Sequence, residues 1–486
     1  MSRKIREECG VFGIYRRDGR DVALKAYYGL FALQHRGQEA CGLVVNDGGQ
    51  MTDFKDVGLV DDVFSRERLF YLGEGNMAVG HVLDSVNVPI NRTNAQPITI
   101  NHIQGSLALA TNGNIINGCA LRRELELTGS IFHTLSDGEI IAAIITRQRL
   151  TADSLEEAIF QALPQLQGAY SMVVMSPQKL IGVRDPRGFR PLCIGRLSDG
   201  YVLSSESCGL DAVGATFLRD VEPGEIVIID EGGLRSLKGY CQGEEKSLCV
   251  FEYLYFARPD SVVDGTPVHE ARKRAGALLA LSHPLNADVV IGVPDSGLDA
   301  ALGYSQQAGI PYGLGFIKNK YIGRTFTELD EDYRESRVRI KLNVVTSTVR
   351  GKRVVMIDDS IVRGTTCARM VKLLRHAGAT EVHVRSAAPP FVNTCHFGIG
   401  IDSAENLIAR QHSVEEIARI IDADSLSYLD IKDIGKLLAV GGDGLCAACF
   451  SNNYPLPRGV GGEAVAKEEG MGKKIGVKVD GDEEEL

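Results

Sequence analysis

Residues 354–366 combine, in order, the side chains that suit a phosphorylated sugar. An apolar run ends in two adjacent carboxylates, Asp358 and Asp359, and a loop containing Gly364 then opens a helix. The helix N-terminus offers unpaired N–H groups and a positive dipole end, and Gly364 lets the backbone approach a phosphate closely. The carboxylates suit sugar hydroxyls or a hard cation such as Mg²⁺, because they would repel the phosphate. The alternative is that the acids only cap the helix and the loop is a plain turn.

Cys9 is a second candidate for chemistry. A cysteine near a terminus is most often a small core residue, but Cys9 follows eight mostly polar residues and precedes the apolar run Gly10–Tyr15. If residues 1–8 are removed as a propeptide, its α-amine, with an ordinary pKa of about 8, can act as general base for its own thiol. A tetrahedral intermediate also needs oxyanion donors, and the Asn112 side chain and the Gly113 backbone N–H are suitable.

Four of the eleven cysteines form a third candidate site. Cys446 and Cys449 are separated by two alanines and can present both sulfurs to one metal, with Cys249 and Cys395 as the remaining candidates. Four thiolates suit tetrahedral zinc or a 4Fe–4S cluster, and the spacing does not decide between these metals. Four buried structural thiols are the alternative.

The composition limits the class of protein that positions these residues. The chain has 486 residues, 44% hydrophobic and 24% charged, which predicts a soluble globular protein of two or three domains. The net charge of −10 argues against a nucleic-acid partner. Neither a signal peptide nor an apolar run of membrane-spanning length is visible, so we expect a cytoplasmic protein without a membrane partner.

The first 230 residues predict packed sheets with a few helices. Helices are expected at Ser136–Leu150, with Ser136 and Glu139 as a capping box, and at Ser154–Leu163, which Pro164 ends. The expected strands are short apolar or alternating runs: Gly10–Tyr15, Met77–Val82, Ser106–Asn112, Ala169–Ser176, Lys179–Asp185 and Glu225–Asp230.

The second half changes character after a polar segment at residues 231–247, where we place the domain boundary. Buried strands alternating with a helix predict a parallel sheet, whose ligands bind at the carboxyl ends of the strands. These elements are expected at Ala287–Val293, Val354–Ile357, Thr366–Ala377 and Glu381–Ala388. Residues 456–486 are rich in Gly, Lys and Glu and predict a disordered acidic tail.

Residues 354–366 resemble the phosphoribosylpyrophosphate-binding loop of type I phosphoribosyltransferases. The resemblance implies a parallel sheet with helices on both faces, a companion loop at Pro294–Ser296 and a flexible lid at Ile317–Phe326. It assigns Mg²⁺ to Ser296, Asp358 and Asp359. The implied phosphoribosylpyrophosphate-binding residues are Asp358, Asp359, Ser360, Ile361, Val362, Arg363, Gly364, Thr365, Thr366, Lys318, Tyr321 and Arg324.

The surroundings of Cys9 resemble the N-terminal-nucleophile glutaminase domain of class II glutamine amidotransferases. This resemblance places Arg36 in the glutaminase pocket and lets Asp137 bind the glutamine α-amine. It implies two packed antiparallel sheets with flanking helices. In order, residues 7–455 resemble the iron–sulfur branch of the glutamine phosphoribosylpyrophosphate amidotransferases. Further matching stretches are Asn94–Pro97, Arg184–Pro191, Val221–Glu225 and Phe256–Asp260.

The resemblance implies an α/β and α+β enzyme with a glutaminase domain at residues 9–238 and a phosphoribosyltransferase domain at residues 239–455. The implied glycosyltransferase reaction converts glutamine, phosphoribosylpyrophosphate and water to 5-phosphoribosylamine, glutamate and pyrophosphate, the first step of purine biosynthesis. It also implies Mg²⁺, purine nucleotide inhibitors and a homotetramer. A 4Fe–4S cluster is implied on Cys249, Cys395, Cys446 and Cys449.

One stretch departs from the family. The family motif is usually Gly-His-Val-Arg-Tyr-Ser-Thr, whereas this chain has Gly-His-Val-Leu-Asp-Ser-Val at Gly80–Val86. Leu83 therefore replaces the Arg that, by the resemblance, binds the glutamine carboxylate, and Val86 replaces a Thr. Arg92 could supply a replacement cation, although surface loops often carry Arg. The departure makes an ammonia-dependent phosphoribosyltransferase with an impaired glutaminase site one alternative. A separate alternative is a non-catalytic phosphoribosylpyrophosphate sensor that uses the cluster for redox input.

Overall fold

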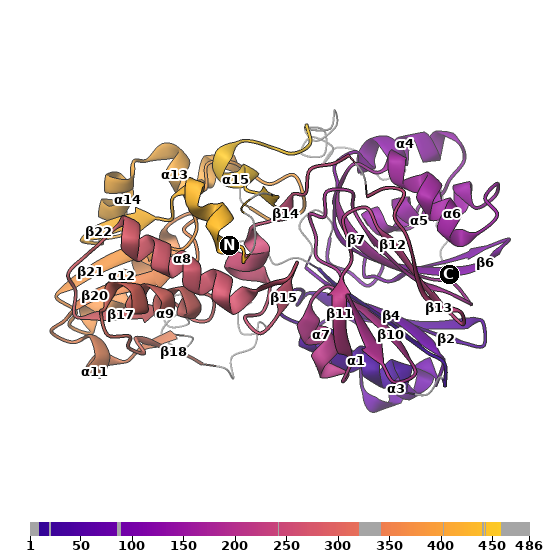
Figure 1. Cartoon of the computed structure of the whole chain (residues 1–486), viewed down its shortest axis with the longest axis horizontal. Coiled ribbons are helices and arrows are strands. Elements are labelled where there is room, and N and C mark those ends of the chain that lie inside the picture. The colour runs from indigo at the N-terminus through magenta and orange to yellow at the C-terminus, as the bar shows by residue number, and fades with distance from the viewer. Residues whose placement is uncertain are drawn as a thin grey trace, which may run out of the picture.

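The computed structural model describes residues 9–18, 21–84, 89–241, 243–319, 342–401, 403–439, 442 and 444–457. They form two lobes, one from the first half of the chain and one from the second (Figure 1). Within these ranges, no helix is long and apolar enough to cross a membrane. The predicted propeptide, most of the predicted lid, most of the predicted acidic tail and Val86 lie outside the described residues.

The first lobe consists of two antiparallel sheets packed face to face, as expected. Their common core consists of alternate strand residues such as Val11, Val79, Ala110 and Val173. The seven-stranded sheet has the order β11 (Thr216–Asp220), β9 (Cys193–Leu197), β10 (Gly200–Ser204), β1 (Gly10–Arg16), β4 (Met77–Leu83), β2 (Ala40–Asp47) and β3 (Gln50–Val57). The six-stranded sheet has the order β13 (Gly233–Leu237), β12 (Ile226–Asp230), β8 (Leu180–Arg184), β7 (Gly168–Met175), β6 (Gly105–Ile115) and β5 (Ile98–His102).

Helices cover the outer faces of both sheets because their apolar stripes need burial. The seven-stranded sheet carries α1 (Val22–Ala32), α2 (Val60–Val63), α3 (Arg66–Leu72) and α7 (Ser207–Ala212). The six-stranded sheet carries α4 (Gly118–Leu127), α5 (Asp137–Gln148) and α6 (Leu155–Ala162).

The second lobe contains the predicted parallel sheet, with helices on both faces. Its order is β17 (Val289–Gly292), β20 (Arg353–Asp358), β21 (Glu381–Ser386) and β22 (Ser425–Tyr428). One face packs on α8 (Val268–Ser282) and α9 (Gly297–Ala308). The other face packs on α12 (Thr365–His376), α13 (Ile408–Gln411) and α14 (Val414–Ile420).

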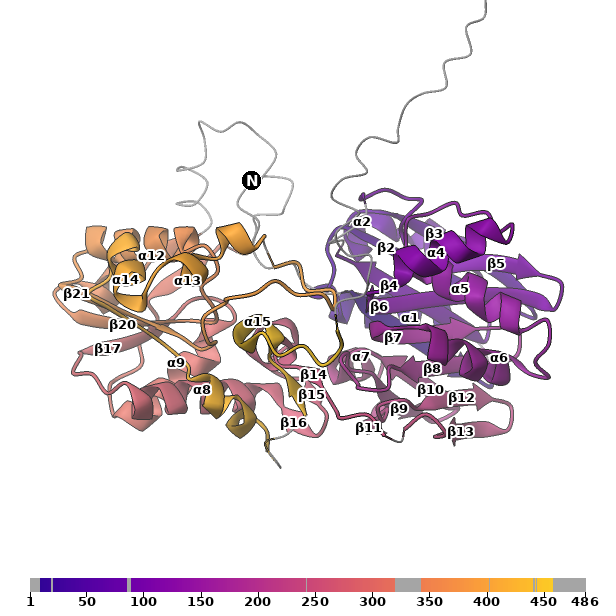
Figure 2. The ribbon, with the colours of Figure 1, turned by 90° about the horizontal axis from the view of Figure 1, so that it is seen from above.

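Short elements complete the second lobe. β14 (Leu248–Cys249) and β23 (Leu445–Cys446) pair in parallel, and with α15 (Ala448–Ser451) they lie at the border between the lobes (Figures 1 and 2). The others are a π-helix at Glu252–Phe256, β15 (Val262–Val263), β16 (Thr266–Pro267), β18 (Phe316–Lys318), β19 (Leu342–Val344), α11 (Thr346–Val349), and 3-10 helices at Ala404–Asn406 and Ile431–Leu437; a further 3-10 helix, Leu163–Gln165, follows α6 in the first lobe.

The predicted capping box of α5 is wrong. Ser136 is the N-cap, but its hydroxyl accepts from the Gly138 N–H. The Glu139 carboxylate instead accepts the N–H groups of His133 and Thr134, at 2.9 and 2.7 Å. The Glu139 carboxylate therefore binds N–H groups of the preceding loop instead of the Ser136 N–H that the local pattern predicts as its partner. The Ser154 cap of α6, by contrast, accepts from the Glu157 N–H as a local pattern predicts.

Candidate active site

Cys9 stands directly before β1 and is half-buried. Its Sγ donates to the Asp84 carbonyl oxygen at 3.6 Å, and it packs against a small apolar cluster of Ala40, Leu83 and Ala95. Leu83 is 4% exposed. The position for which the resemblance implies a carboxylate-binding Arg therefore presents an apolar side chain beside Cys9.

Asn112 and Gly113 lie near the C-terminal end of β6, directly after Thr111, whose carbonyl oxygen contacts His81 of β4 across the sandwich. Asn112 is fully buried, and neither its amide nitrogen nor its amide oxygen has a hydrogen-bond partner among the described residues. Gly113 has φ +129°, and a Cβ there would lie 2.0 Å from the Ala169 carbonyl oxygen, so only glycine fits. A buried, unpaired amide is costly unless a ligand uses it, which favours the predicted oxyanion role.

His81 ties the two sheets together beside this strand end. Its Nε2 lies 2.9 Å from the Thr111 carbonyl oxygen, and burial lowers the pKa of His81 to about 4. The imidazole is therefore neutral at pH 7 and donates one ring N–H to β6 of the facing sheet.

Asp137 lies in the first turn of α5, and its Oδ2 accepts the Ile115 N–H at 2.9 Å. Ile115 is the last residue of β6, so the predicted amine-binding carboxylate adjoins the strand end that carries Asn112 and Gly113. Burial raises the pKa of Asp137 to about 6.

Arg36 has a different environment from the predicted glutamine contact. Its side chain is fully buried, and its Nε donates to the Cys9 carbonyl oxygen at 3.1 Å. Its terminal nitrogens donate to the Glu206 carboxylate at 2.7 Å and to the Glu252 carboxylate at 2.8 and 2.9 Å. These contacts suit a residue that positions the Cys9 main chain and joins it to the second lobe.

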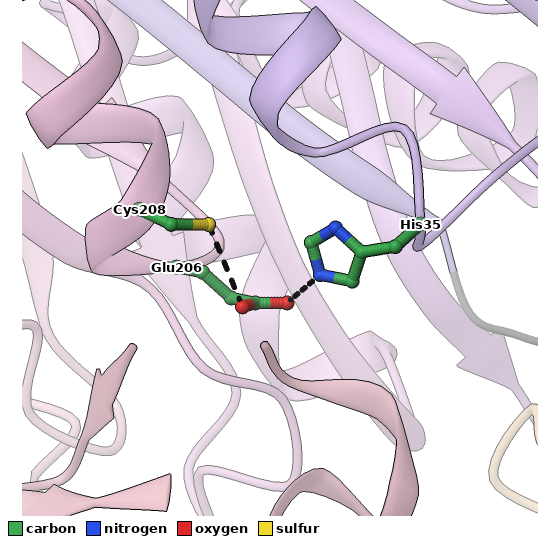
Figure 3. Close-up of side chains that lie close together, drawn as sticks. All are labelled: His35, Glu206 and Cys208. Carbon is green, nitrogen blue, oxygen red and sulfur yellow. Dashed lines mark hydrogen bonds and ion pairs between the residues drawn. The ribbon is translucent and has the colours of Figure 1, made fainter. Parts of the chain in front are cut away.

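His35, Glu206 and Cys208 lie close enough together to suggest a metal site (Figure 3). His35 Nε2 is 2.7 Å and Cys208 Sγ is 3.7 Å from the Glu206 carboxylate. That carboxylate also accepts from Arg36 and from the Ser261 hydroxyl, so its oxygens are occupied and a cation already stands beside it. Burial alone would raise the pKa of Glu206, but His35 and Arg36 hold it well below its usual range. The group is an ionic cluster of the first lobe, hydrogen-bonded to Ser261 of the second lobe, rather than a metal site.

The carboxylates predicted to face the ribose lie at the end of β20. Asp358 is buried, and its Oδ1 accepts the Asp359 N–H at 3.0 Å. Asp359 accepts the Ser360 hydroxyl at 2.6 Å and also the Ser296 hydroxyl, which joins the two predicted loops. Gly364, at φ +76°, directly precedes α12.

The fold turns the side chains of two predicted phosphoribosylpyrophosphate-binding residues, Ile361 and Val362, into the protein core. Ile361 packs into one core of the second lobe and Val362 against the other, so they can offer a ligand only their backbone atoms. Lys318 Nζ bonds Asp295 Oδ2 at 2.5 Å, which places this cation at the companion loop. Tyr321 and Arg324 lie outside the described residues.

The four candidate cysteines line a single small cavity at the border between the lobes, shared with Phe189, Arg190 and Phe397 among others. Cys249 and Cys446 are register partners of β14 and β23. Burial, reinforced by Cys395 and Cys446, raises the pKa of the Cys449 thiol well above its ordinary value. Such a sulfur-only donor set fits a soft, thiolate-bound metal, since binding would remove the cost of charging these thiols.

The sequence argument missed Glu206 and Glu252, which hold Arg36. Glu206 is the N-cap of α7 and Glu252 is the first residue of the π-helix, but nothing in their local pattern singles out a buried carboxylate. Their partner lies more than 150 residues away in the chain, at 170 and 216 residues.

Comparisons with known proteins agree with this division. A glutamine amidotransferase domain model matches residues 85–212, and a phosphoribosyl transferase domain model matches residues 270–388. The amidophosphoribosyltransferase of Archaeoglobus fulgidus is 46% identical over 450 residues, covering 92% of this chain and 98% of the relative. That of Bacillus subtilis is 47% identical over 456 residues, covering 93% and 94%.

A solved structure gives the same result. Glutamine phosphoribosylpyrophosphate amidotransferase from B. subtilis, complexed with ADP and GMP, superposes with a TM-score of 0.87 at 46% identity, over 93% of this chain and 98% of that one. The chain therefore belongs to the amidophosphoribosyltransferase family, the glycosyltransferases that catalyse the first step of purine biosynthesis.

Proposed function

We propose that the two lobes divide the reaction, with glutamine hydrolysis at Cys9 and phosphoribosyl transfer at Asp358 and Asp359. The observation that carries this proposal is Asn112, a buried amide without a partner among the described residues. Asn112 is next to Thr111, which contacts His81, the β4 partner of Val11 at the start of β1. We assign residues 9–238 to the glutaminase domain and residues 239–455 to the phosphoribosyltransferase domain, because β13 ends at Leu237 and the next strand carries Cys249.

Once residues 1–8 are removed, the Cys9 α-amine accepts the proton of its own thiol. The thiolate attacks the glutamine carboxamide carbon, and the Asn112 amide and the Gly113 N–H donate to the oxyanion that forms. The amine then gives its proton to the leaving nitrogen, which departs as ammonia. Water hydrolyses the remaining thioester, releases glutamate and restores the thiol. Asp137 binds the substrate's ammonium group.

The phosphoribosylpyrophosphate site follows from the loop between β20 and α12. Asp358 and Asp359 accept the ribose hydroxyls, while the backbone from Ser360 to Thr366 surrounds the 5-phosphate. The oxygen atoms of Asp358, Asp359 and Ser296 are suited to Mg²⁺, which would offset the charge of the pyrophosphate leaving group. Ammonia from the first lobe displaces pyrophosphate at the ribosyl carbon.

We also propose that Cys249, Cys395, Cys446 and Cys449 hold one 4Fe–4S cluster. Their shared cavity supports four thiolates around one centre, and the Phe397 N–H donates to Cys395 Sγ at 3.2 Å, an arrangement typical of cluster ligands. Anaerobically prepared protein should contain about four irons and four sulfides per chain. One equivalent of zinc without iron would overturn the choice of metal.

Further proposals concern partners and location. The B. subtilis relative was solved with ADP and GMP, so we propose purine nucleotides as inhibitors of this chain. We also propose that the chain forms a homotetramer. Finally, we propose a cytoplasmic enzyme, because the four clustered cysteines of the shared cavity would keep the thiol form that a metal needs in a reducing compartment.

The decisive experiment measures pyrophosphate release from phosphoribosylpyrophosphate and Mg²⁺, once with glutamine and once with ammonia. Activity with both donors, and loss of only the glutamine activity in Cys9→Ala, would support the division of labour. Activity with ammonia alone would favour the impaired-glutaminase alternative, which Leu83 beside Cys9 motivates. Release with neither donor would leave only a sensor and refute the proposal.

A further inference from the structure

The segment Cys395–Gly398 of the second lobe lies directly against the end of β6. The Asn114 Nδ2 donates to the His396 carbonyl oxygen at 2.9 Å, although the two residues are 282 positions apart. Asn114 follows Gly113, so this bond anchors the strand immediately beyond the proposed oxyanion donors.

Gly398 approaches the same backbone closely. It has φ +109°, and a Cβ there would lie 3.3 Å from Asn114 Cβ and 3.4 Å from the Gly113 carbonyl carbon. Both the positive φ and the tight contact favour glycine at this position. A side chain at position 398 would thus meet the Gly113 peptide, so the second lobe runs close beside this peptide.

The contacts around Phe397 hold the segment in place. Its ring stacks on Phe189 with centroids 4.5 Å apart, and both side chains are buried. Its carbonyl oxygen accepts a hydrogen bond from Arg190, and its N–H donates to Cys395 Sγ. The segment is therefore fixed at one end to the four-cysteine cavity and at its centre to the first lobe.

We propose that Cys395–Gly398 is a positioning element for the oxyanion donors Asn112 and Gly113. Such donors act only when they lie about 2.7–3.1 Å from the developing oxyanion, so a support that sets the path of the β6 end controls the hydrolytic rate. Glutamine hydrolysis then depends on a segment of the phosphoribosyltransferase lobe that never touches glutamine. This inference rests on the proposed roles of Cys9, Asn112 and Gly113.

The test is Asn114→Asp in the full chain, with Asn117→Asp as the matched control. Each substitution replaces an amide donor by a carboxylate opposite a backbone carbonyl, since the Asn117 Nδ2 donates to the Gln165 oxygen at 2.8 Å. The Asn117 bond, however, stays within the first lobe. Asn114→Asp should lower kcat for glutamine hydrolysis by about tenfold or more, with the KM for glutamine changed by less than about twofold.

Three further readouts separate positioning from general damage. In Asn114→Asp, ammonia-dependent pyrophosphate release, the iron and sulfide content, and alkylation of Cys9 by iodoacetamide, followed by mass spectrometry, should match wild type. The control Asn117→Asp should keep the wild-type kcat for glutamine. A wild-type kcat in Asn114→Asp, or an equal loss of both activities in the folded variant, would overturn the inference.

If Asn114→Asp does not fold, Phe397→Leu tests the same support by removing the stack on Phe189 while keeping an apolar side chain. It should lower the glutamine kcat selectively, and an unchanged kcat would overturn the inference. Cys9→Ala separates the two levels of the argument. If Cys9→Ala still hydrolyses glutamine, the proposed function fails. If Cys9→Ala is inactive but both support variants hydrolyse glutamine normally, only the positioning role fails.

Discussion

Leu83→Arg should improve the use of glutamine without changing the use of ammonia. In the structure Leu83 packs beside Cys9, where the family's Arg would meet the substrate α-carboxylate. Leu83 offers that carboxylate no cation, so we expect wild-type glutamine to bind without the charge-assisted contact that the family motif implies at this position.

The magnitude follows from that contact. A hydrogen bond to a charged group is worth about 1.5–3 kcal/mol, which corresponds to roughly 10- to 150-fold in binding. Leu83 is 4% exposed, so a new guanidinium would be buried without a partner until glutamine arrives. The free variant should therefore unfold at a lower temperature than wild type, and glutamine should raise its melting temperature more than that of wild type.

The assay compares kcat/KM for glutamine and for ammonia in Leu83→Arg, Leu83→Met and wild type. Arg should raise the glutamine-to-ammonia ratio at least several-fold, mainly through a lower KM, because the contact is made in both the ground state and the transition state. Met keeps the volume without the charge and should leave the ratio unchanged. A micromolar KM for glutamine in wild type would refute the reasoning, and Arg92→Ala would then show whether Arg92 has taken over the carboxylate.

Three other predictions follow from the proposed sites. Asp358→Asn combined with Asp359→Asn should abolish pyrophosphate release with either nitrogen donor; appreciable ammonia-dependent activity in the folded double variant would disprove the ribose site. The kcat/KM for glutamine should fall as the pH drops below about 6, because burial raises the pKa of Asp137 in the free enzyme and its protonated form cannot hold an ammonium group. Asp137→Asn should have a low kcat/KM for glutamine at all pH values. A wild-type kcat/KM that does not change through pH 6 would contradict the role of Asp137 in binding the ammonium group. Intact-mass measurement should show a mature chain beginning at Cys9; full glutaminase activity with residues 1–8 still attached would rule out the α-amine as base.

The sequence by itself determined the parts that depend on contiguous residues. The apolar run before Asp358, the paired carboxylates, Gly364 and the following helix are neighbours in the chain, so their order already specifies strand, loop and helix. Val354–Ile357 are all apolar, and successive side chains of a strand point to opposite faces. Both faces of β20 are therefore apolar, and each packs against its own layer of helices. Local periodicity decides such elements because backbone geometry repeats over a few residues.

Tertiary structure decided which distant side chains meet. The sequence places Arg36 in the predicted glutaminase pocket. In the fold it pairs with Glu206 and Glu252 and donates to the Cys9 carbonyl oxygen, so it lies at the lobe interface and holds the Cys9 main chain. The Glu139 carboxylate accepts hydrogen bonds from a loop rather than from the N-cap of its own helix, because the fold places the His133 and Thr134 N–H groups beside it. Buried polar groups must find partners wherever the fold brings a donor near, and that pairing is set by the packing of sheets and lobes, which no local pattern encodes.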